Sequence, residues 1–510
     1  MSRALVVGID ASTSACKAVV WDLDGQVVAE GRAGLSVWMP KPGWHEQPAK
    51  NWWSAMARAL RMAVCQVDAR RLAGLAIAHQ RETFVPLDRR GEPLRNGIVW
   101  MDERAGGMLD GLAAELDRDS FHRETGKPLS GNLTVTKIAW LRAHEPDMFA
   151  RTALWADVHA YLVSRLTGTA RTGWGCADPT GLFDMARNSW SERVLHAIGV
   201  GVEQLPPALP PGALLGMVTG AAAKASGLPE GLPVFAGLGD GQAGGVGAGI
   251  CTPGTAYLAL GTSVISGTFS DHFVVDPAYR SMYGGVAGTY LLETVLLGGT
   301  YTLDWFFKTL LGKRGKGLVQ LRDKLEQNLA QVPPGSHGLA VVPYWNSAMS
   351  PYWDATASGM ILGLRGSHGP GELYRAILEG IALELRLQLQ GVERSLGGEI
   401  RQLVAMGGGA RSAGWRQIIA DVTGKPVAHA VTPEAAALGA GILAAVGAGL
   451  FPSVVAAAER MSHWSPERTQ PDAARHAFYS ELFQSVYTGL YPAVRSNLAR
   501  LSGLSERSGG

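Results

Sequence analysis

The chain contains 510 residues, carries a formal net charge of +2, and is 46% hydrophobic and 18% charged. This length exceeds what a single hydrophobic core supports, so we expect a globular protein with at least two large domains. The near-neutral charge and the lack of a long basic run give no support to a nucleic-acid partner.

Two uncharged runs, residues 241–270 and 435–458, are long enough to span a bilayer. Both owe their apolarity mainly to glycine and alanine, and Pro253 and Pro452 interrupt them, so we expect no membrane partner. We interpret residues 435–458 as a buried helix and residues 241–270 as a glycine-rich strand–turn–strand. The four cysteines lie far apart in the sequence, which disfavours a disulfide framework or a zinc site and predicts a cytoplasmic location.

In chain order, the first predicted elements form a β-hairpin. Residues 4–10 and 17–23 are apolar runs rich in β-branched side chains, and a polar turn at 11–16 joins them. Asp24-Gly25 predicts a further turn into a strand over 26–33, and helical periodicity follows over 51–67.

Two polar segments that follow apolar strands come next. Arg81 and Glu82 follow a strand predicted at 74–78, and Trp100 follows one at 97–99. A guanidinium and a carboxylate at a strand end can hold vicinal hydroxyls, and a tryptophan face can pack on the C–H surface of a polyol. These residues predict a pocket for a sugar or polyol; the alternative is a surface ion pair beside a core tryptophan.

Asp240 is the leading candidate for chemistry. It follows a buried strand predicted at 234–239 and lies among glycines, which let a substrate approach the backbone and let amides bind an anion. An acid beside an anion-binding loop suggests a general base that activates a nucleophile toward a phosphate. Residues 239–244 match a dinucleotide fingerprint, but we reject that reading because no acid to hold a ribose occurs between Asp240 and Asp271.

A second hairpin repeats the first about 250 residues later. Strands predicted at 254–260 and 264–269 are joined by Gly261-Thr262-Ser263. The duplication predicts two related α/β domains that face each other, with both hydroxyl-bearing tips at a central cleft. Mixed α/β layers are predicted by a strand at 402–406 and by helical periodicity at 372–389, 415–422 and 434–446.

The domain boundary is expected just after Asp240. We assign residues 1–246 to a first domain, with the predicted sugar pocket and the first hairpin tip. Residues 247–503 form the second domain, with the second hairpin tip and the glycine-rich segment at 406–412. Residues 504–510 are expected to be a flexible tail, because the chain is small and polar from Ser502 onward.

The two hairpin tips are candidate phosphate sites. The sequence has no Walker-type P-loop, but Thr13, Ser14 and Thr262 can donate hydroxyl and backbone N–H bonds to phosphate oxygens. Lys17 could add a positive charge, and Asp10 could hold Mg²⁺ directly or through water. The alternative is that each tip only caps an ordinary hairpin.

A third glycine-rich segment, residues 406–412, follows a predicted strand and precedes a helix that begins near Trp415. Its glycines leave room for a flat ring to lie against the main chain. Ser412 can cap the helix, and the helix N-terminus favours a nearby phosphate. An ordinary β–α turn is the alternative.

Together these motifs resemble the FGGY family of carbohydrate kinases over nearly the whole chain. The resemblance is carried by Gly8-Ile-Asp10 with Thr13-Ser14, Gly43-Trp-His-Glu-Gln47 with Trp52-Trp53, Thr180-Gly-Leu-Phe-Asp184, a first signature around Thr134 and Lys137, and a full second signature from Gly359 to Gly380. It implies two actin-like (ribonuclease H-like) α/β domains that flank a central nucleotide cleft. It also implies phosphorylation of a sugar or polyol that depends on ATP and Mg²⁺.

The resemblance also implies roles for individual residues. Asp240 corresponds to the general base and Asp10 to the metal-associated aspartate. The residues expected at ATP are Ser12, Thr13, Ser14, Lys17, Gly261, Thr262, Gly407, Gly408, Gly409 and Arg411. Those expected at the sugar are Arg81, Glu82, Trp100, Asp240 and Gln242.

Departures from the family pattern leave the substrate open. Ser12 replaces the usual glycine of the first phosphate loop, and Gly241 replaces an amide-bearing residue found after the base in many members. The Arg81-Glu82 pair resembles glycerol kinases, whereas residues 407–412 and 434–439 look most like xylulokinases. A pentulose such as D-xylulose is the expected substrate. Glycerol, ribulose, another polyol, or a weakly catalytic nucleotide-binding sensor are the alternatives, and a homodimer is left open as the assembly state.

Overall fold

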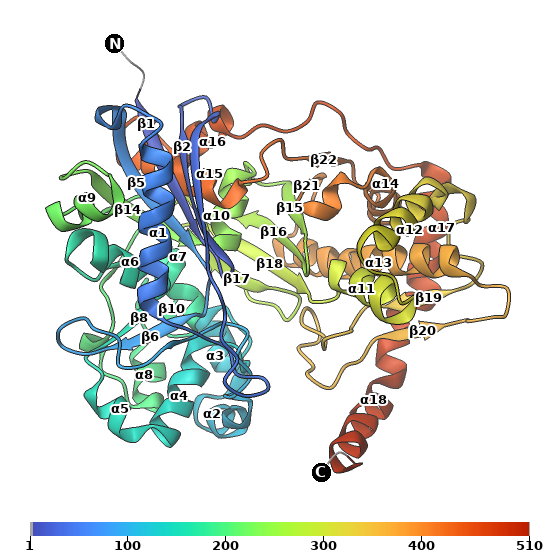
Figure 1. The fold of residues 1–510 in the computed structure, drawn as a ribbon. Helices are drawn as coiled ribbons and strands as arrows, with labels where there is room; N and C mark the ends of the chain where they lie inside the picture. The colour runs from blue at the N-terminus through green and yellow to red at the C-terminus, as the bar shows by residue number, and fades with distance from the viewer. Residues whose placement is uncertain (1–3, 509–510) are drawn as a thin grey trace.

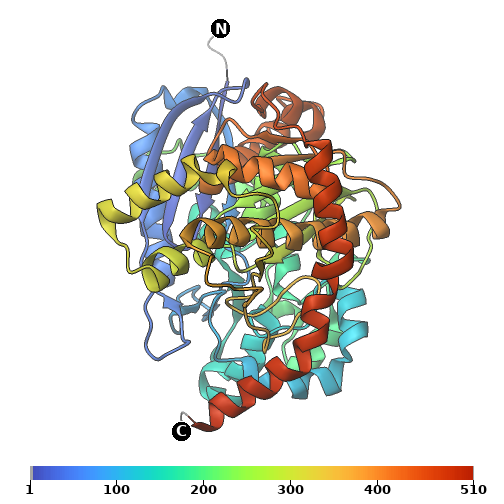
Figure 2. The ribbon, with the colours of Figure 1, turned by 90° about the vertical axis from the view of Figure 1, so that its right-hand side faces the viewer.

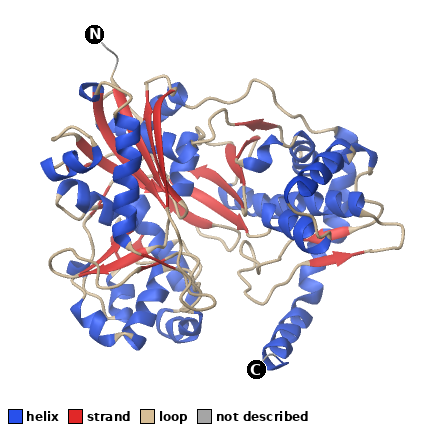
Figure 3. Ribbon diagram, in the orientation of Figure 1, coloured by secondary structure: helices blue, strands red, loops and turns tan. Residues whose placement is uncertain are grey.

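A computed structural model describes residues 4–508 as two lobes, each built around a six-stranded sheet (Figure 1). The strands gather in the middle of the molecule and most helices cover them from outside (Figure 3). Among residues 4–508, no helix combines the length and the apolar character that crossing a bilayer would take.

The first sheet has the strand order β13-β14-β5-β1-β2-β3. Its strands are β1 (Leu5–Ala11), β2 (Ala15–Trp21), β3 (Val27–Gly34), β5 (Leu72–His79), β13 (Leu214–Met217) and β14 (Pro233–Gly239). β1, β5 and β14 are parallel, whereas β2, β3 and β13 pair antiparallel with their neighbours. The predicted hairpin is therefore β1–β2, and Gly25, with φ of 73°, turns the chain into β3 as predicted.

The second sheet repeats this pattern, with the order β17-β18-β16-β15-β21-β22. Its strands are β15 (Thr255–Leu260), β16 (Val264–Ser270), β17 (Arg280–Tyr283), β18 (Tyr290–Leu296), β21 (Gln402–Met406) and β22 (Val427–His429). β15 and β16 form the second predicted hairpin, and β21 and β22 extend the sheet in parallel. In both sheets a hairpin and a third antiparallel strand adjoin two parallel strands, which confirms the predicted duplication.

Smaller sheets extend both lobes. One contains β4 (Glu46–Gln47), β7 (Gly97–Ile98), β6 (Phe84–Leu87) and β8 (Leu154–Asp157). The two-stranded sheets pair β9 (Thr172–Gly173) with β12 (Ala208–Leu209), β10 (Phe183–Asp184) with β11 (Ser189–Trp190), and β19 (Ala340–Val342) with β20 (Met360–Leu362).

Helices cover the sheets. Those of the first half are α1 (Ala49–Val64), α2 (Leu109–Leu116), α3 (Arg118–Thr125), α4 (Thr134–His144), α5 (Pro146–Arg151), α6 (Val158–Thr167), α7 (Trp174–Ala177), α8 (Glu192–Ile198), α9 (Gly220–Ser226) and α10 (Asp240–Gly247). Those of the second half are α11 (Thr300–Trp305), α12 (Gly315–Gln327), α13 (Pro370–Leu396), α14 (Ala413–Thr423), α15 (Ala435–Gly447), α16 (Val454–Met461), α17 (Ala473–Leu482) and α18 (Thr488–Ser508). The helices predicted from periodicity are α1, α13, α14 and α15.

The helix α15 joins the two halves, because it comes from the second half of the sequence but packs on β1 and β5 of the first sheet and against α10 (Figure 1). Two glycines permit this close packing. A Cβ at Gly8 would lie 1.8 Å from the Ala437 carbonyl oxygen, and one at Gly439 would lie 1.9 Å from the Ala243 carbonyl oxygen. The first sheet therefore depends on a helix that begins about 200 residues after the last strand of that sheet, β14.

One sequence expectation was wrong in its local structure. Residues 241–247 are helical, as part of α10, rather than the start of a strand–turn–strand, because packing against α15 outweighs the low helix propensity of glycine. The carboxyl terminus from Ser502 is also helical, since α18 continues to Ser508 and descends along one side of the molecule (Figure 2). Residues 509–510 lie outside the described range.

Candidate active site

The predicted chemical groups gather where three parallel strands end. In the first sheet, Asp10 of β1 lies beside Ala78 of β5, and Gly239 of β14 lies beside His79. Arg81 follows β5, and Asp240 begins α10 directly after β14. The carboxyl ends of parallel strands are where open α/β sheets bind ligands, so the topology explains why distant residues meet here.

Asp240 is close enough to Asp10 to affect its ionisation. Burial and the negative charge of Asp240 raise the pKa of Asp10 to about 7, against the opposing effect of Lys17. Partial burial also raises the pKa of Asp240, although the Arg81 guanidinium opposes this rise. The Asp240 side chain is still 41% exposed, so a carboxylate with increased proton affinity remains accessible to a ligand, as a general base requires.

Arg81 forms one ion pair with Asp240 and another with a residue of the second half of the chain. Its Nε lies 3.0 Å from Asp240 Oδ1, and its terminal nitrogen donates to Glu293 Oε2 on β18 at 2.8 Å. Arg280 on β17 donates to Glu293 Oε1 at 2.5 Å and to Glu82 Oε1 at 2.7 Å. These five residues form one chain of alternating charges, which we call the cleft network.

The cleft network gives two residues of the predicted sugar pocket partners that the sequence did not indicate. Arg81 and Glu82 were expected to present a donor and an acceptor side by side to vicinal hydroxyls. Instead, each is buried and forms an ion pair with a residue of the second half, and the backbone at Glu82 takes a positive φ of 55°. Sequence reasoning missed Arg280 and Glu293; the available signal was a lone acid inside the apolar strand Tyr290–Leu296.

Trp100 and the first hairpin tip lie together. The Trp100 indole N–H donates to Thr13 Oγ1 at 2.9 Å, and the Gln47 side chain donates to the Thr13 carbonyl at 2.7 Å. The predicted sugar platform and the predicted phosphate tip therefore share a boundary. The Ser12 hydroxyl is used inside the turn, where it donates to the Ala15 carbonyl at 2.8 Å.

Lys137 of the first signature fixes the pocket segments from behind. Its buried ammonium group donates to the carbonyl oxygens of Glu82 at 3.2 Å, Val99 at 3.1 Å and Trp100 at 3.2 Å. One cation thus ties the segment after β5 to the segment after β7. Thr134, one turn earlier on α4, also donates to the Glu82 carbonyl.

Two predicted ligands are not available in the way expected. Lys17 Nζ forms a 2.6 Å ion pair with Glu434 Oε2, so it balances an acid rather than standing free for a phosphate. The cause is its place on β2, where it pairs in register with Asp10 and faces the start of α15. Gln242 is 1% exposed, and its amide donates to the Gly175 carbonyl at 2.8 Å, so the structure does not present it to a ligand.

The second hairpin tip and the third glycine segment lie at one sheet edge. The carbonyls of Gly261 and Thr262 accept from the Thr300 and Tyr301 amides at 2.8 and 3.2 Å. β15 ends beside β21, whose last residue precedes Gly407. Gly407 has φ of 85°, and a Cβ there would lie 3.0 Å from the Leu260 carbonyl oxygen.

The chain then forms a 3₁₀ turn at Gly408–Arg411 and enters α14. A Cβ at Gly409 would lie 2.5 Å from the Trp415 ring, so a side chain does not fit here. Arg411 is exposed, and the Ser412 hydroxyl caps α14 as predicted by accepting from the Trp415 amide at 2.9 Å.

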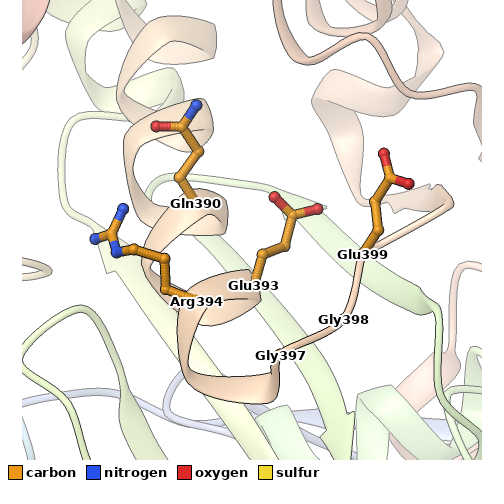
Figure 4. Close-up of a pocket in the computed structure, with 6 residues that line it drawn as sticks. All are labelled: Gln390, Glu393, Arg394, Gly397, Gly398 and Glu399. Carbon is orange, nitrogen blue, oxygen red and sulfur yellow. The ribbon is translucent and has the colours of Figure 1, made fainter.

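A surface hollow elsewhere contains none of the predicted residues. It lies at the carboxyl end of α13 and is lined by Gln390, Glu393, Arg394, Gly397, Gly398 and Glu399 (Figure 4). The Glu393 carboxylate already accepts from Lys425 and from the Ile400 amide. The cleft network therefore remains the candidate site.

Comparison with known proteins defines the class. The family models for the N-terminal and C-terminal domains of the FGGY family of carbohydrate kinases match residues 5–247 and 256–448. The chain therefore belongs to this family and is a sugar kinase, a phosphotransferase that uses ATP, as its motifs predicted. The predicted two-domain, actin-like fold is also confirmed.

Relatives and solved structures place the chain within the family. It is 30% identical to a xylulose kinase of Escherichia coli (strain K12), over 96% of this chain and 100% of the relative. It is also 30% identical to a glycerol kinase of Aromatoleum aromaticum, over 91% of this chain and 93% of that protein. The crystal structure of a xylulose kinase from Rhodospirillum rubrum superposes with a TM-score of 0.90 at 30% identity, covering 97% of this chain and 99% of that one.

Proposed function

We propose that this sugar kinase transfers the γ-phosphate of ATP to a primary hydroxyl of a small neutral ketose, with D-xylulose as the first candidate. The observation that carries the proposal is Asp240, an accessible carboxylate of raised proton affinity at the end of a strand, beside Asp10. The similarity to xylulose kinases over nearly the whole chain supports the substrate.

In this mechanism Asp240 accepts the proton of the attacking hydroxyl. The sugar oxygen forms a bond to the γ-phosphorus while the bond from that phosphorus to the bridging oxygen of ADP breaks. Arg81 fixes the carboxylate that receives the proton. Phosphoryl transfer depends mainly on positioning and charge stabilisation, so a single base and well-placed donors are sufficient.

Asp10 is the residue that would hold Mg²⁺. Its Oδ1 is buried and has no hydrogen-bond partner among the described residues, which suits an oxygen that binds a hard cation directly or through water. When bound, the ion would neutralise charge on the phosphate oxygens.

The proposed ATP site divides between the two halves. Residues 1–246 would supply the tip at Ser12, Thr13 and Ser14, together with the base. Residues 247–503 would supply Gly261, Thr262 and the adenosine segment Gly407–Arg411. Gly407 and Gly409 lie close to Leu260 of β15 and leave no room for side chains there. This supports the segment as the place where a flat ring lies against the main chain.

The charge of the cleft network argues for a neutral sugar. It contains three carboxylates and two guanidinium groups, and both guanidinium groups are engaged by carboxylates. The remaining negative charge would repel an aldonate or a sugar phosphate. Glycerol remains the second candidate, supported by the Arg81-Glu82 motif and by the glycerol kinase relative.

The test is ADP release from Mg-ATP with D-xylulose, D-ribulose, pentitols, tetritols, glycerol and gluconate, against a control without sugar. Strong turnover with D-xylulose supports the proposal. Turnover with glycerol alone would identify the protein as a glycerol kinase, the second candidate. Turnover with gluconate would contradict the argument that the site selects a neutral sugar. ATP binding without turnover on any sugar would indicate a weakly catalytic nucleotide-binding sensor.

A further inference from the structure

We propose that Glu293 and Arg280, which belong to the second half of the chain, are positioning residues for the general base Asp240. Glu293 holds Arg81 in the orientation in which Arg81 meets the Asp240 carboxylate, and Arg280 fixes Glu293 and Glu82 together. The inference rests on the proposed function of Asp240.

The contacts of Glu293 are specific. Each of its two oxygens accepts from a different guanidinium, Oε2 from Arg81 and Oε1 from Arg280, at 2.8 and 2.5 Å. Its side chain is fully buried. A buried carboxylate that is shared by two guanidinium groups fixes both of them, because each charge would be costly to leave unpaired.

The electrostatics agree with this geometry. Burial by itself would raise the pKa of Glu293, but Arg81 and Arg280 together lower it below the ordinary value. Glu293 therefore stays ionised and continues to hold Arg81.

The two glycines beside Asp240 make room for the cleft network. A Cβ at Gly241 would lie 2.6 Å from Glu293 Oε2, and one at Gly239 would lie 2.5 Å from the aliphatic part of Arg81. Gly241 is the position at which the chain departs from the family pattern by lacking an amide side chain. The Glu293 carboxylate occupies the space that a side chain at position 241 would need, so the cleft network requires glycine there.

The network also crosses between the halves. Arg81, Glu82 and Asp240 come from the first half, and Arg280 and Glu293 come from neighbouring strands of the second sheet. The orientation of the base therefore depends on how the second sheet sits against the first half. The alternative is that the network only holds the two halves together and does not affect the orientation of the base.

Two variants test the proposal by different means. Glu293→Gln removes the charge, and Gly241→Ala leaves every charge in place but displaces the Glu293 carboxylate. Both should lower kcat about 10–100-fold, the size expected when a reacting group is misplaced, while KM for ATP stays within about two-fold.

Each variant has a matched control. Gly244→Ala makes the same change in the same helix, but its Cβ would meet only ordinary contact, with Met406 Cε at 3.5 Å. Glu379→Gln removes a buried carboxylate whose partners, Gly335, Ser336, Arg375 and Tyr479, all lie in the second half. Both controls should keep kcat, even if Glu379→Gln lowers the melting temperature.

The decisive measurement repeats Glu293→Gln and Gly241→Ala in an Asp240→Asn background. If Glu293 acts through Asp240, neither change lowers the residual kcat further. An equal further loss in that background, or a wild-type kcat in both single variants, would overturn the inference. If Asp240→Asn alone keeps full activity, the assignment of the base fails, which is a separate result from a failure of the network.

Discussion

At the residue scale, Asp240 carries the proposed chemistry, and its amide variant isolates the carboxylate. Asp240→Asn keeps the size of the side chain and its place at the start of α10 but cannot accept a proton. We expect kcat to fall about 10²–10⁴-fold, the usual contribution of a general base, with KM for ATP nearly unchanged. Steady-state kinetics with the preferred sugar checks this. A rise in KM for ATP at constant kcat would instead indicate that Asp240 binds nucleotide.

Asp10 gives a prediction about stability and pH. Its pKa is raised from 3.8 to about 7, first by burial and then by Asp240, so the folded protein binds a proton that the unfolded chain has released. The stability that this proton provides is complete below about pH 4 and is lost as the pH rises through 7. Asp10→Asn, which cannot ionise, should therefore gain stability over the wild type as the pH rises.

The measurement is chemical unfolding of both proteins between pH 5 and 8, with a chelator to keep them free of metal. The advantage of Asp10→Asn should increase with pH toward an upper limit of about 4 kcal/mol. A difference that does not change with pH would mean that the carboxyl group titrates normally. Added Mg²⁺ should reduce the advantage at pH 8 if Asp10 holds the ion.

At the element scale, the contact between α10 and α15 depends on glycine. A Cβ at Gly439 would lie 1.9 Å from the Ala243 carbonyl oxygen, and backbone atoms cannot move aside as a flexible side chain can. Gly439→Ala should therefore lower the free energy of unfolding by about 2 kcal/mol or more, despite the better helix propensity of alanine.

Gly489 is the matched control. It is also helical, but outside its own helix no described atom lies within 4 Å of the position that its Cβ would take. Gly489→Ala should be neutral or stabilise the protein by up to about 1 kcal/mol. Equal effects of the two substitutions in thermal unfolding would contradict the close packing of α10 on α15.

Features that depend on neighbouring residues could be predicted from the sequence. The hairpins, the strand-end acids and the Ser412 cap each follow from a few adjacent residues, and the structure contains them all. α10 could not be predicted, because its glycines disfavour a helix in isolation and only tertiary packing stabilises it.

Ion pairs between residues far apart in the chain also could not be predicted from the sequence. Lys17 meets Glu434 across 417 positions, and Arg81 meets Glu293 across 212. No local pattern specifies these partners, because they depend on how two sheets face each other. For this reason the sequence placed Arg81 and Glu82 at the strand end but gave no sign of Glu293 and Arg280 as their partners.

At the scale of the whole molecule, the two halves are not independent. α15 covers the first sheet, where its Ala437, Leu438 and Ile442 share a buried cluster with Val6 and Trp21 of that sheet. Residues 1–246 alone would expose this apolar face to water. The domain boundary predicted after residue 246 therefore separates the first sheet from α15, the helix that completes its hydrophobic core.

We expect the isolated fragment 1–246 to lack a cooperative thermal transition, because exposing this much apolar surface exceeds the marginal stability of a domain. The same fragment joined through a flexible linker to residues 431–461 should regain the transition, since the added segment restores α15 and α16. Ala440 is fully buried on α15, so the fusion carrying Ala440→Asp should fail, as it would place an unpaired charge in the cluster. Cooperative melting of 1–246 without the added segment would show that the first half folds independently and that α15 only docks on a finished domain.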